Sequence, residues 1–179
     1  MRALITGITG QDGYFLSKLL LDKQYDVYGI TRMKADMKLG ALEYDESLKK
    51  DVHIILGDVT DAEFIEKTVA VIRPDELYHL AAQSSVALSF ENPSYTYDVN
   101  IKGTLNVLNA VRDVSRGTRV YNAATSEMYG KPDTAPQNEN TPMKPRSPYA
   151  VSKLAAYWTA RDYREAYGLF IANGILFNH

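Results

Sequence analysis

Four side chains in the second half of the chain have the types and spacing of an acid and base set. Thr125 offers a hydroxyl and Glu127 a carboxylate, and both follow a predicted strand. Tyr149 and Lys153 stand four positions apart in a predicted helix, so they share one face of it. We expect the Lys153 ammonium to stabilise the Tyr149 phenolate; lowering its pKa from about 10 to about 7 takes about 4 kcal/mol. Such a phenolate can take a proton from an alcohol at neutral pH while a hydride leaves the same carbon.

A glycine-rich turn near the N-terminus has the pattern of a phosphate-binding loop. The turn GITGQDG joins an apolar strand, RALIT, to a predicted helix that runs from Gln11 to Lys23. Gly7 permits the tight turn, Gly10 lets the backbone approach a pyrophosphate, and Gly13 lets the helix pack close to the sheet. The free N–H groups at the start of the helix suit phosphate oxygens. The predicted dinucleotide-binding residues of this turn are Gly7, Ile8, Thr9, Gly10, Gln11, Asp12 and Gly13.

The end of the second predicted strand bears on which dinucleotide is bound. Proteins that bind NAD carry an acidic residue about twenty positions on, whereas an arginine nearby accommodates the 2′-phosphate of NADP. This chain has Arg32 there, no carboxylate from position 28 to 35, and a second cation at Lys34. Because a phosphomonoester carries about −1.5 to −2 charges near neutral pH, the guanidinium of Arg32 favours NADP as the cofactor.

Composition limits the classes of protein to consider. With 179 residues, 45% of them hydrophobic, the chain can bury a substantial core as one domain. A net charge of −2 gives no basis for binding nucleic acid, and we find no targeting segment and no run of eighteen apolar residues. We therefore expect a cytoplasmic protein without membrane contact. The chain has no cysteine, and His53, His79 and His179 are too scattered to indicate a metal site.

Strand-like and helix-like segments alternate along the chain. We expect strands at 2–6, 26–34, 52–56, 76–80, 118–123 and 171–177, and helices at 11–23, 61–72, 92–114 and 148–167. Asn92 and Pro93 suit the N-cap and first turn of one helix, and Pro148 opens the last. This order predicts a doubly wound, mostly parallel, Rossmann-like α/β sheet covered on both faces. Ligands bind at the carboxyl ends of such strands, where every motif above lies.

The longer motifs resemble those of the GDP-mannose 4,6-dehydratases, a branch of the extended short-chain dehydrogenase/reductase superfamily. The G-x-x-G-x-x-G spacing is typical of the superfamily, whereas TGQDG, TSEMYG, PRSPY and GILFNH are specific to the branch. The likeness runs from end to end. It implies that NADP takes a hydride from carbon 4 of the hexose with Tyr149 as base, and that Glu127 removes the carbon 5 proton as water leaves carbon 6. The hydride then returns to carbon 6.

The resemblance also assigns binding residues outside the glycine-rich turn. It places Asp58 and Val59 near the adenine and His179 near the nicotinamide. Beside the cofactor it places Leu80, Ala81, Ala82, Gln83, Ser84 and Tyr95, together with Tyr149 and Lys153. The candidate substrate-binding residues are Ser85, Ser126 and Asn178. Structural roles are the alternatives: Tyr95 as packing, Asp58 as a strand-end cap and His179 as part of a frayed terminus.

Departures from the family pattern affect assembly and substrate. Arg32 is followed by MKADMKLG rather than by a second arginine and the Ser-rich segment that in many members reaches a neighbouring subunit's cofactor. We therefore expect a homodimer, formed through the helices at 93–114 and 148–167, with a tetramer as the alternative. Ser85 stands where the family often has histidine. Because family chains continue past FNH, we expect residues 1–179 to form the NADP-binding domain with the catalytic residues, and a substrate domain to lie beyond it.

Several functions fit these motifs. The leading hypothesis is conversion of GDP-D-mannose to GDP-4-keto-6-deoxy-D-mannose, and a GDP-heptose that Ser85 could admit is the alternative substrate. A nucleotide-sugar epimerase or reductase on the same scaffold would have no use for Glu127 as an elimination base. A module that binds NADP without catalysis would not need Thr125, Glu127, Tyr149 and Lys153 together.

Overall fold

The computed structural model describes residues 1–32 and 45–178, which fold around one sheet. Within these residues the sheet has six strands in the order β3-β2-β1-β4-β5-β6, and every neighbouring pair is parallel. The strands are β1 (Arg2–Thr6), β2 (Asp26–Thr31), β3 (Val52–Leu56), β4 (Glu76–His79), β5 (Arg119–Thr125) and β6 (Ile171–Leu176). The predicted doubly wound fold is confirmed, and the sheet is parallel throughout.

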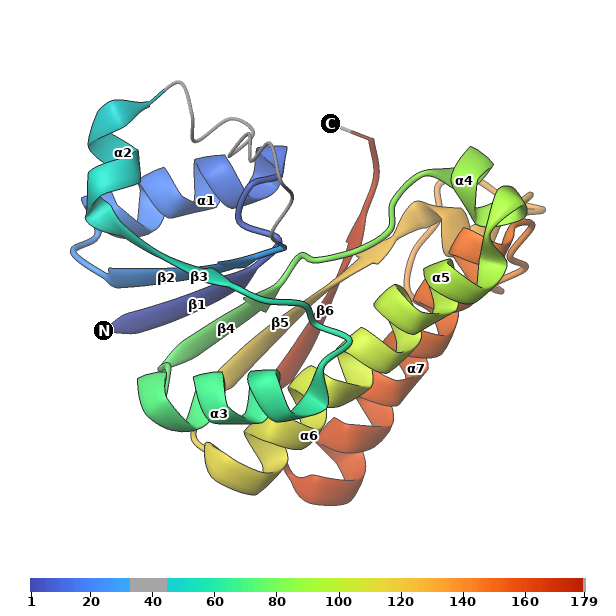
Figure 1. Cartoon of the computed structure of the whole chain (residues 1–179). Helices are drawn as coiled ribbons and strands as arrows, with labels where there is room; N and C mark the ends of the chain where they lie inside the picture. The colour runs from blue at the N-terminus through green and yellow to red at the C-terminus, as the bar shows by residue number, and fades with distance from the viewer. Residues whose placement is uncertain (33–44, 179) are drawn as a thin grey trace.

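Helices cover both faces of this sheet. They are α1 (Gln11–Asp22), α2 (Glu46–Asp51), α3 (Ala62–Ile72), α4 (Val86–Glu91), α5 (Pro93–Tyr97), α6 (Gly103–Val114) and α7 (Pro148–Tyr167). Figure 1 shows α1 and α2 over one face, beside β1, β2 and β3, and α3, α6 and α7 against the other face. The arrangement gives three layers, with the sheet between two sets of helices.

The strands are apolar because both of their faces are buried. In β1, Leu4 points into the core beneath α3, α6 and α7, whereas Ala3 and Ile5 point into the smaller core beneath α1 and α2. All three side chains are fully inaccessible to solvent. This alternation fixes β1 at the centre of the sheet, and the strand order reverses beside it, between β1 and β4. A crevice opens at such a reversal, outside the carboxyl ends of the strands.

Helix caps follow the sequence closely. The Asn92 side chain accepts a hydrogen bond from the backbone N–H of Tyr95, as expected for an N-cap ahead of Pro93. Ser147 caps α7 in the same way, through the N–H of Ala150. These caps set the starting points of the two helices that border the crevice.

Three elements differ from the expectation. The single helix expected at 92–114 is interrupted by a π turn, Asp98–Lys102, and α2 and α4 are additional helices. In α1 the buried positions are Gly13, Ser17 and Leu20, whereas the apolar residues Phe15 and Leu19 are 62% and 51% exposed. The close approach at Gly13 decides which face of α1 is buried. Lys34 and His179 lie outside the described residues.

Candidate active site

Two adjoining cavities occupy the crevice at the strand ends. The larger has a volume of about 550 Å³ and the smaller about 440 Å³, and Gly7, Gly10, Leu80 and Ser84 line both. The remaining lining of the larger cavity is Thr9, Ile30, Thr31, Arg32, Gly57, Asp58, Val59, Ala81, Ala82 and Val99. The remaining lining of the smaller cavity is Gln11, Asp12, Gly13, Phe177 and Asn178. The shared residues make the cavities one elongated crevice, the shape that an extended dinucleotide requires.

The glycine-rich turn forms the floor between the two cavities. Gly7 has φ +75°, and a Cβ there would lie 2.8 Å from the Ala81 backbone. A Cβ at Gly13 would lie 2.4 Å from the carbonyl oxygen of Ile8, so α1 approaches the turn as closely as the sequence predicts. Gly10 is the N-cap of α1 and provides no side-chain cap, which leaves the first N–H groups of the helix directed toward the crevice. Backbone donors and a helix dipole therefore face the space where a pyrophosphate would lie.

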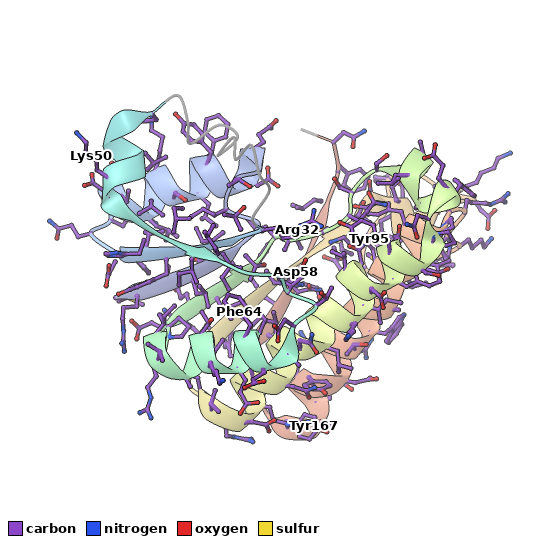
Figure 2. All side chains as sticks on the ribbon, in the orientation of Figure 1. Arg32, Lys50, Asp58, Phe64, Tyr95 and Tyr167 are labelled. Atoms are coloured by element: carbon purple, nitrogen blue, oxygen red, sulfur yellow. The ribbon has the colours of Figure 1, made fainter. Side chains whose placement is uncertain are left out.

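Arg32 and Asp58 lie at the wide end of the crevice. Arg32 follows β2 directly, and its guanidinium donates a hydrogen bond to the Tyr95 hydroxyl from α5. Figure 2 shows the three labelled side chains, Arg32, Asp58 and Tyr95, between the end of β2 and α5. One Asp58 carboxylate oxygen, Oδ1, accepts hydrogen bonds of 2.9 Å from both the N–H and the hydroxyl of Thr60. The arrangement places a cation and a carboxylate at one nucleoside-sized space.

Three of the four predicted acid and base residues interact at the end of β5. Thr125 is the last residue of that strand, and its hydroxyl lies close enough to the Tyr149 phenol to lower the pKa of that phenol. Glu127 lies close enough for its charge to act on the same phenol. The chain does not continue beyond Thr125 as an extended segment. A 3₁₀ helix, Ser126–Tyr129, turns the chain instead, and the Thr125 hydroxyl accepts the Glu127 N–H at 3.2 Å.

The end of β5 lies next to the segment that enters the smaller cavity. Thr125 pairs with Leu176 in the sheet register, and Phe177 and Asn178 follow Leu176 into the cavity lining. The Phe177 ring lies 6.4 Å from the ring of Tyr129, at the end of the 3₁₀ helix. The end of β5, which carries Thr125, is thus next to the segment that lines the smaller cavity.

The expected lowering of the Tyr149 pKa is wrong for this structure. Burial raises the pKa of Tyr149, the Thr125 hydroxyl opposes that effect, and the charge of Glu127 adds to it. Lys153 is on the expected face of α7, but its Nζ donates to the carbonyl oxygen of Ala123 at 2.8 Å. Burial also lowers the pKa of Lys153 to about 8. The i, i+4 spacing brought the two residues onto one face without directing the ammonium at the phenol.

Several predicted binding residues have other roles in the structure. Ile8 is fully buried in the core beneath α1, and Gln83 lines neither cavity. The Gln83 amide instead donates to the Thr96 hydroxyl and to the Ser85 carbonyl. The Ser85 hydroxyl caps α4 by accepting the Leu88 N–H. Ser126 lies half-buried at the start of the 3₁₀ helix. The positions of the Ile8 and Gln83 side chains therefore do not support the prediction that these residues contact the cofactor.

A buried polar network behind the crevice was missed by sequence reasoning. Asn100, in the π turn, donates through its amide to the Gln83 carbonyl at 3.0 Å and to the Ser152 hydroxyl at 2.9 Å. Ser152 in turn donates to the Tyr149 carbonyl at 2.7 Å. The network ties the end of β4 to the helix that carries Tyr149. A buried asparagine inside an apolar helical pattern is the signal that could have identified it.

His79 belongs to the same buried layer. Its ring nitrogens pair with the Thr6 hydroxyl at 2.8 Å and the Thr104 hydroxyl at 3.1 Å. Burial, together with the positive charge of Lys153, lowers the pKa of His79 to about 3, so the imidazole is neutral at physiological pH. His79 therefore links β4 to β1 and α6 as a neutral hydrogen-bonding group.

The described residues contain no group of three or more His, Asp or Glu side chains that could hold a metal ion. No helix in the described ranges is long and apolar enough to cross a membrane.

Comparison with known proteins places the chain in a family. A family model described as GDP-mannose 4,6 dehydratase matches residues 4–179. The GDP-mannose 4,6-dehydratase of Yersinia enterocolitica is 50% identical over 184 residues, an alignment that covers 99% of this chain and 50% of that protein. The chain spans about half the length of the curated relatives it matches.

Solved structures agree with the fold. The dTDP-glucose 4,6-dehydratase DesIV of Streptomyces venezuelae, crystallised with NAD, is 29% identical with a TM-score of 0.84, over 97% of this chain and 54% of that one. The UDP-glucose 4-epimerase of Thermus thermophilus in complex with NAD is 31% identical with a TM-score of 0.83, over 97% and 54%. The motifs, the sheet order and the family match agree, and the chain belongs to the GDP-mannose 4,6-dehydratase family.

Proposed function

We propose that this chain carries the cofactor-binding and catalytic part of an NADP-dependent GDP-mannose 4,6-dehydratase. The observation that carries the proposal is the meeting of Thr125, Tyr149 and Glu127 at the carboxyl end of β5. A dehydrogenase needs the first two groups; an elimination needs the additional carboxylate. Similarity to GDP-mannose 4,6-dehydratases over 99% of this chain supports the substrate class.

The residues of the crevice fit a nicotinamide dinucleotide. The turn at Gly7 has no room for a side chain, and α1 presents uncapped N–H groups to a pyrophosphate. Arg32 lies at the wide end, where a guanidinium suits a ribose 2′-phosphate better than the bare hydroxyl of NAD. When bound, NADP would accept a hydride from carbon 4 of the sugar and return it to carbon 6.

The chain's own residues divide the proton transfers. Tyr149 removes the hydroxyl proton at carbon 4, and the Thr125 hydroxyl, which already reaches the phenol, holds the same sugar oxygen. The ketone at carbon 4 makes the carbon 5 proton acidic. Glu127 removes that proton and passes it to the hydroxyl of carbon 6, which departs as water. The proton that Tyr149 took from the carbon 4 hydroxyl balances the one that carbon 5 regains when the hydride returns to carbon 6, so the sugar loses one water and its overall oxidation state is unchanged.

Ionisation of Tyr149 is the demanding part of this scheme. Burial and Glu127 both raise its pKa, so the phenol is protonated at neutral pH in the structure described above. Lys153, buried and one helical turn along α7, is the cation that the chain offers to counter this. When the phenol ionises, the Lys153 ammonium must therefore either break its hydrogen bond to the Ala123 carbonyl or interact with both groups.

An epimerase on the same scaffold is the second candidate. Its support is the likeness to UDP-glucose 4-epimerases, which share the fold at 31% identity. Glu127 favours the dehydratase, because an epimerase that oxidises and reduces carbon 4 alone needs no base at carbon 5. A GDP-heptose remains the alternative substrate for a dehydratase.

We also propose that the protein is a homodimer that pairs through α6 and α7. Leu105 on α6 and Val151 and Trp158 on α7 are 37%, 42% and 46% exposed. Val151 and Trp158 are two helical turns apart and lie on one face. Trp158 therefore faces outward from α7, whereas the Tyr163 hydroxyl donates a hydrogen bond to Asn109 within the chain. A tetramer is the alternative, and a cytoplasmic location stays a prediction.

Incubation with candidate sugars tests the proposed function. The protein expressed from its complete gene is mixed with GDP-mannose or a GDP-heptose, and the products are separated and weighed by mass spectrometry. The dehydratase gives a product lighter by one water that contains a 4-keto group and a deuterium at carbon 6 when carbon 4 carries deuterium. A product of unchanged mass that is epimeric at carbon 4 would establish the epimerase instead.

A further inference from the structure

The contact between Arg32 and Tyr95 spans the wide end of the crevice. Arg32 follows β2, on one side of the reversal in strand order, and Tyr95 lies in α5, on the other side (Figure 2). The Arg32 Nη1 donates a hydrogen bond to the Tyr95 hydroxyl. The guanidinium carbon also lies 5.7 Å from the centroid of the Tyr95 ring, within the range of a cation–π contact. Tyr95 therefore holds Arg32 through both its hydroxyl and its ring.

Both partners are anchored at their backbones. The Thr31 carbonyl, immediately before Arg32, accepts the N–H of Gly57 at 3.0 Å, which ties the end of β2 to the loop after β3. The N–H of Tyr95 is bonded to the Asn92 cap. The Thr96 hydroxyl receives the Gln83 amide at 2.9 Å, which ties α5 to the loop after β4. The two side chains thus meet between fixed points, and their meeting restricts a long arginine that otherwise has many rotamers.

The contact leaves the charge of Arg32 available. A guanidinium has five N–H donors, and one of them goes to Tyr95. Within the described residues this partner is a neutral phenol, so it orients the guanidinium without neutralising it. A phosphate gains most from an arginine when two parallel N–H groups point at it, which makes orientation as important as charge.

We propose that Tyr95 is a positioning residue that aims the Arg32 guanidinium at the cofactor's ribose 2′-phosphate and thereby sets the preference for NADP over NAD. This inference rests on the proposed NADP-dependent function. Tyr95 acts through Arg32 here, and its effect falls on the part of the cofactor that NAD lacks. If Tyr95 only packed against the nucleotide, its loss would weaken both cofactors, because their adenine and pyrophosphate groups are the same.

Calorimetric titration of matched variants tests the inference. The protein from its complete gene, freed of bound nucleotide, is titrated with NADP, NAD and adenosine 2′,5′-bisphosphate, a probe that fills only the adenosine end. The variants are Tyr95→Phe, which keeps the ring, Arg32→Ala and the double variant. Tyr97→Phe makes the same change two positions along α5, on a residue that lines neither cavity, and serves as the control.

We expect Tyr95→Phe to weaken the binding of NADP and of the bisphosphate by about 3- to 10-fold, the range that corresponds to the net loss of one ordinary hydrogen bond. NAD should change less than about twofold, Tyr97→Phe should leave all three ligands unchanged, and Tyr95→Phe should add no loss in the Arg32→Ala background. Equal losses for NADP and NAD, additive losses in the double variant or an unchanged Tyr95→Phe would overturn the positioning role. If the unmodified protein binds NAD as well as NADP, the proposed cofactor preference itself fails and the positioning role with it.

Discussion

Acidification should destabilise this protein through His79. The imidazole is fully buried between Thr6 and Thr104, and its pKa in the folded state is lowered from 6.5 to about 3. Below pH 6.5, His79 therefore binds a proton in the unfolded chain but stays neutral in the folded chain. Since the folded pKa is the lower one, the stability is present above pH 6.5 and is lost as the pH falls toward 3.

The magnitude follows from this difference in proton uptake. Between pH 7 and pH 5 the unfolded His79 becomes almost fully protonated, while the folded one stays neutral. Integration of the proton difference at about 1.36 kcal/mol per pH unit gives a loss of about 2 kcal/mol. Any folded pKa below about 4 gives nearly the same result, so the prediction does not depend on the lower value.

Urea unfolding at several pH values measures this loss. His79→Gln keeps a hydrogen-bonding side chain and removes the titration, so the comparison cancels the carboxylates common to both proteins. The sole tryptophan, Trp158, and far-UV circular dichroism provide two probes of unfolding. The free energy of unfolding of the unmodified protein should fall by about 2 kcal/mol more than that of His79→Gln from pH 7 to pH 5. If the free energies of unfolding of the two proteins change with pH in parallel, the conclusion that the buried His79 imidazole stays neutral is wrong.

Three further predictions concern packing, Lys153 and assembly. Gly13→Ala should destabilise the fold by about 2 kcal/mol in urea unfolding, because its Cβ would lie 2.4 Å from the Ile8 carbonyl oxygen; Gly117→Ala, where a Cβ meets nothing within 4 Å, is the control. Burial lowers the pKa of Lys153 from 10.5 to about 8, so the folded protein should become more stable as this lysine loses its charge. From pH 8 to pH 10 the free energy of unfolding of the unmodified protein should therefore rise by about 2 kcal/mol relative to that of Lys153→Met, and a difference between the two proteins that does not change with pH would contradict this prediction. Light scattering should show a dimer that Trp158→Glu converts to monomers; a monomer before the substitution would rule out the proposed pairing.

The fold was predictable because its signals are local. Apolar strands alternating with capped helices specify parallel pairing, and Gly7 and Gly13 mark the turn where α1 approaches the sheet. The position of Arg32 follows from the end of β2, which the hydrophobic pattern indicates. Each of these inferences needs only neighbouring residues and the geometry of one element.

The unpredicted features depend on side chains that meet across the fold. Arg32 and Tyr95 are 63 positions apart, and only the docking of α5 brings them together. The π turn around Asn100 differs from a regular helix by one residue, which an apolar pattern does not reveal. The spacing of Tyr149 and Lys153 gave a common face but neither the burial of the phenol nor the direction of the Lys153 Nζ, so the sign of the Tyr149 pKa shift was wrong.

A single turnover of Glu127→Gln tests the proposed elimination most directly. The protein from its complete gene, with NADP bound, is mixed with GDP-mannose in a stopped-flow instrument, beside Tyr149→Phe as the control. Glutamine keeps the size and polarity of Glu127 but removes the base, so carbon 4 should be oxidised and a 4-keto sugar should accumulate with the absorbance of reduced nicotinamide. Tyr149→Phe should give neither signal, because the carbon 4 hydroxyl has lost its base. Release of the 4-keto-6-deoxy sugar by Glu127→Gln at the unmodified rate would contradict the assignment of Glu127 as the elimination base, and the absence of any 4-keto sugar from the unmodified protein would contradict the dehydratase account of this site.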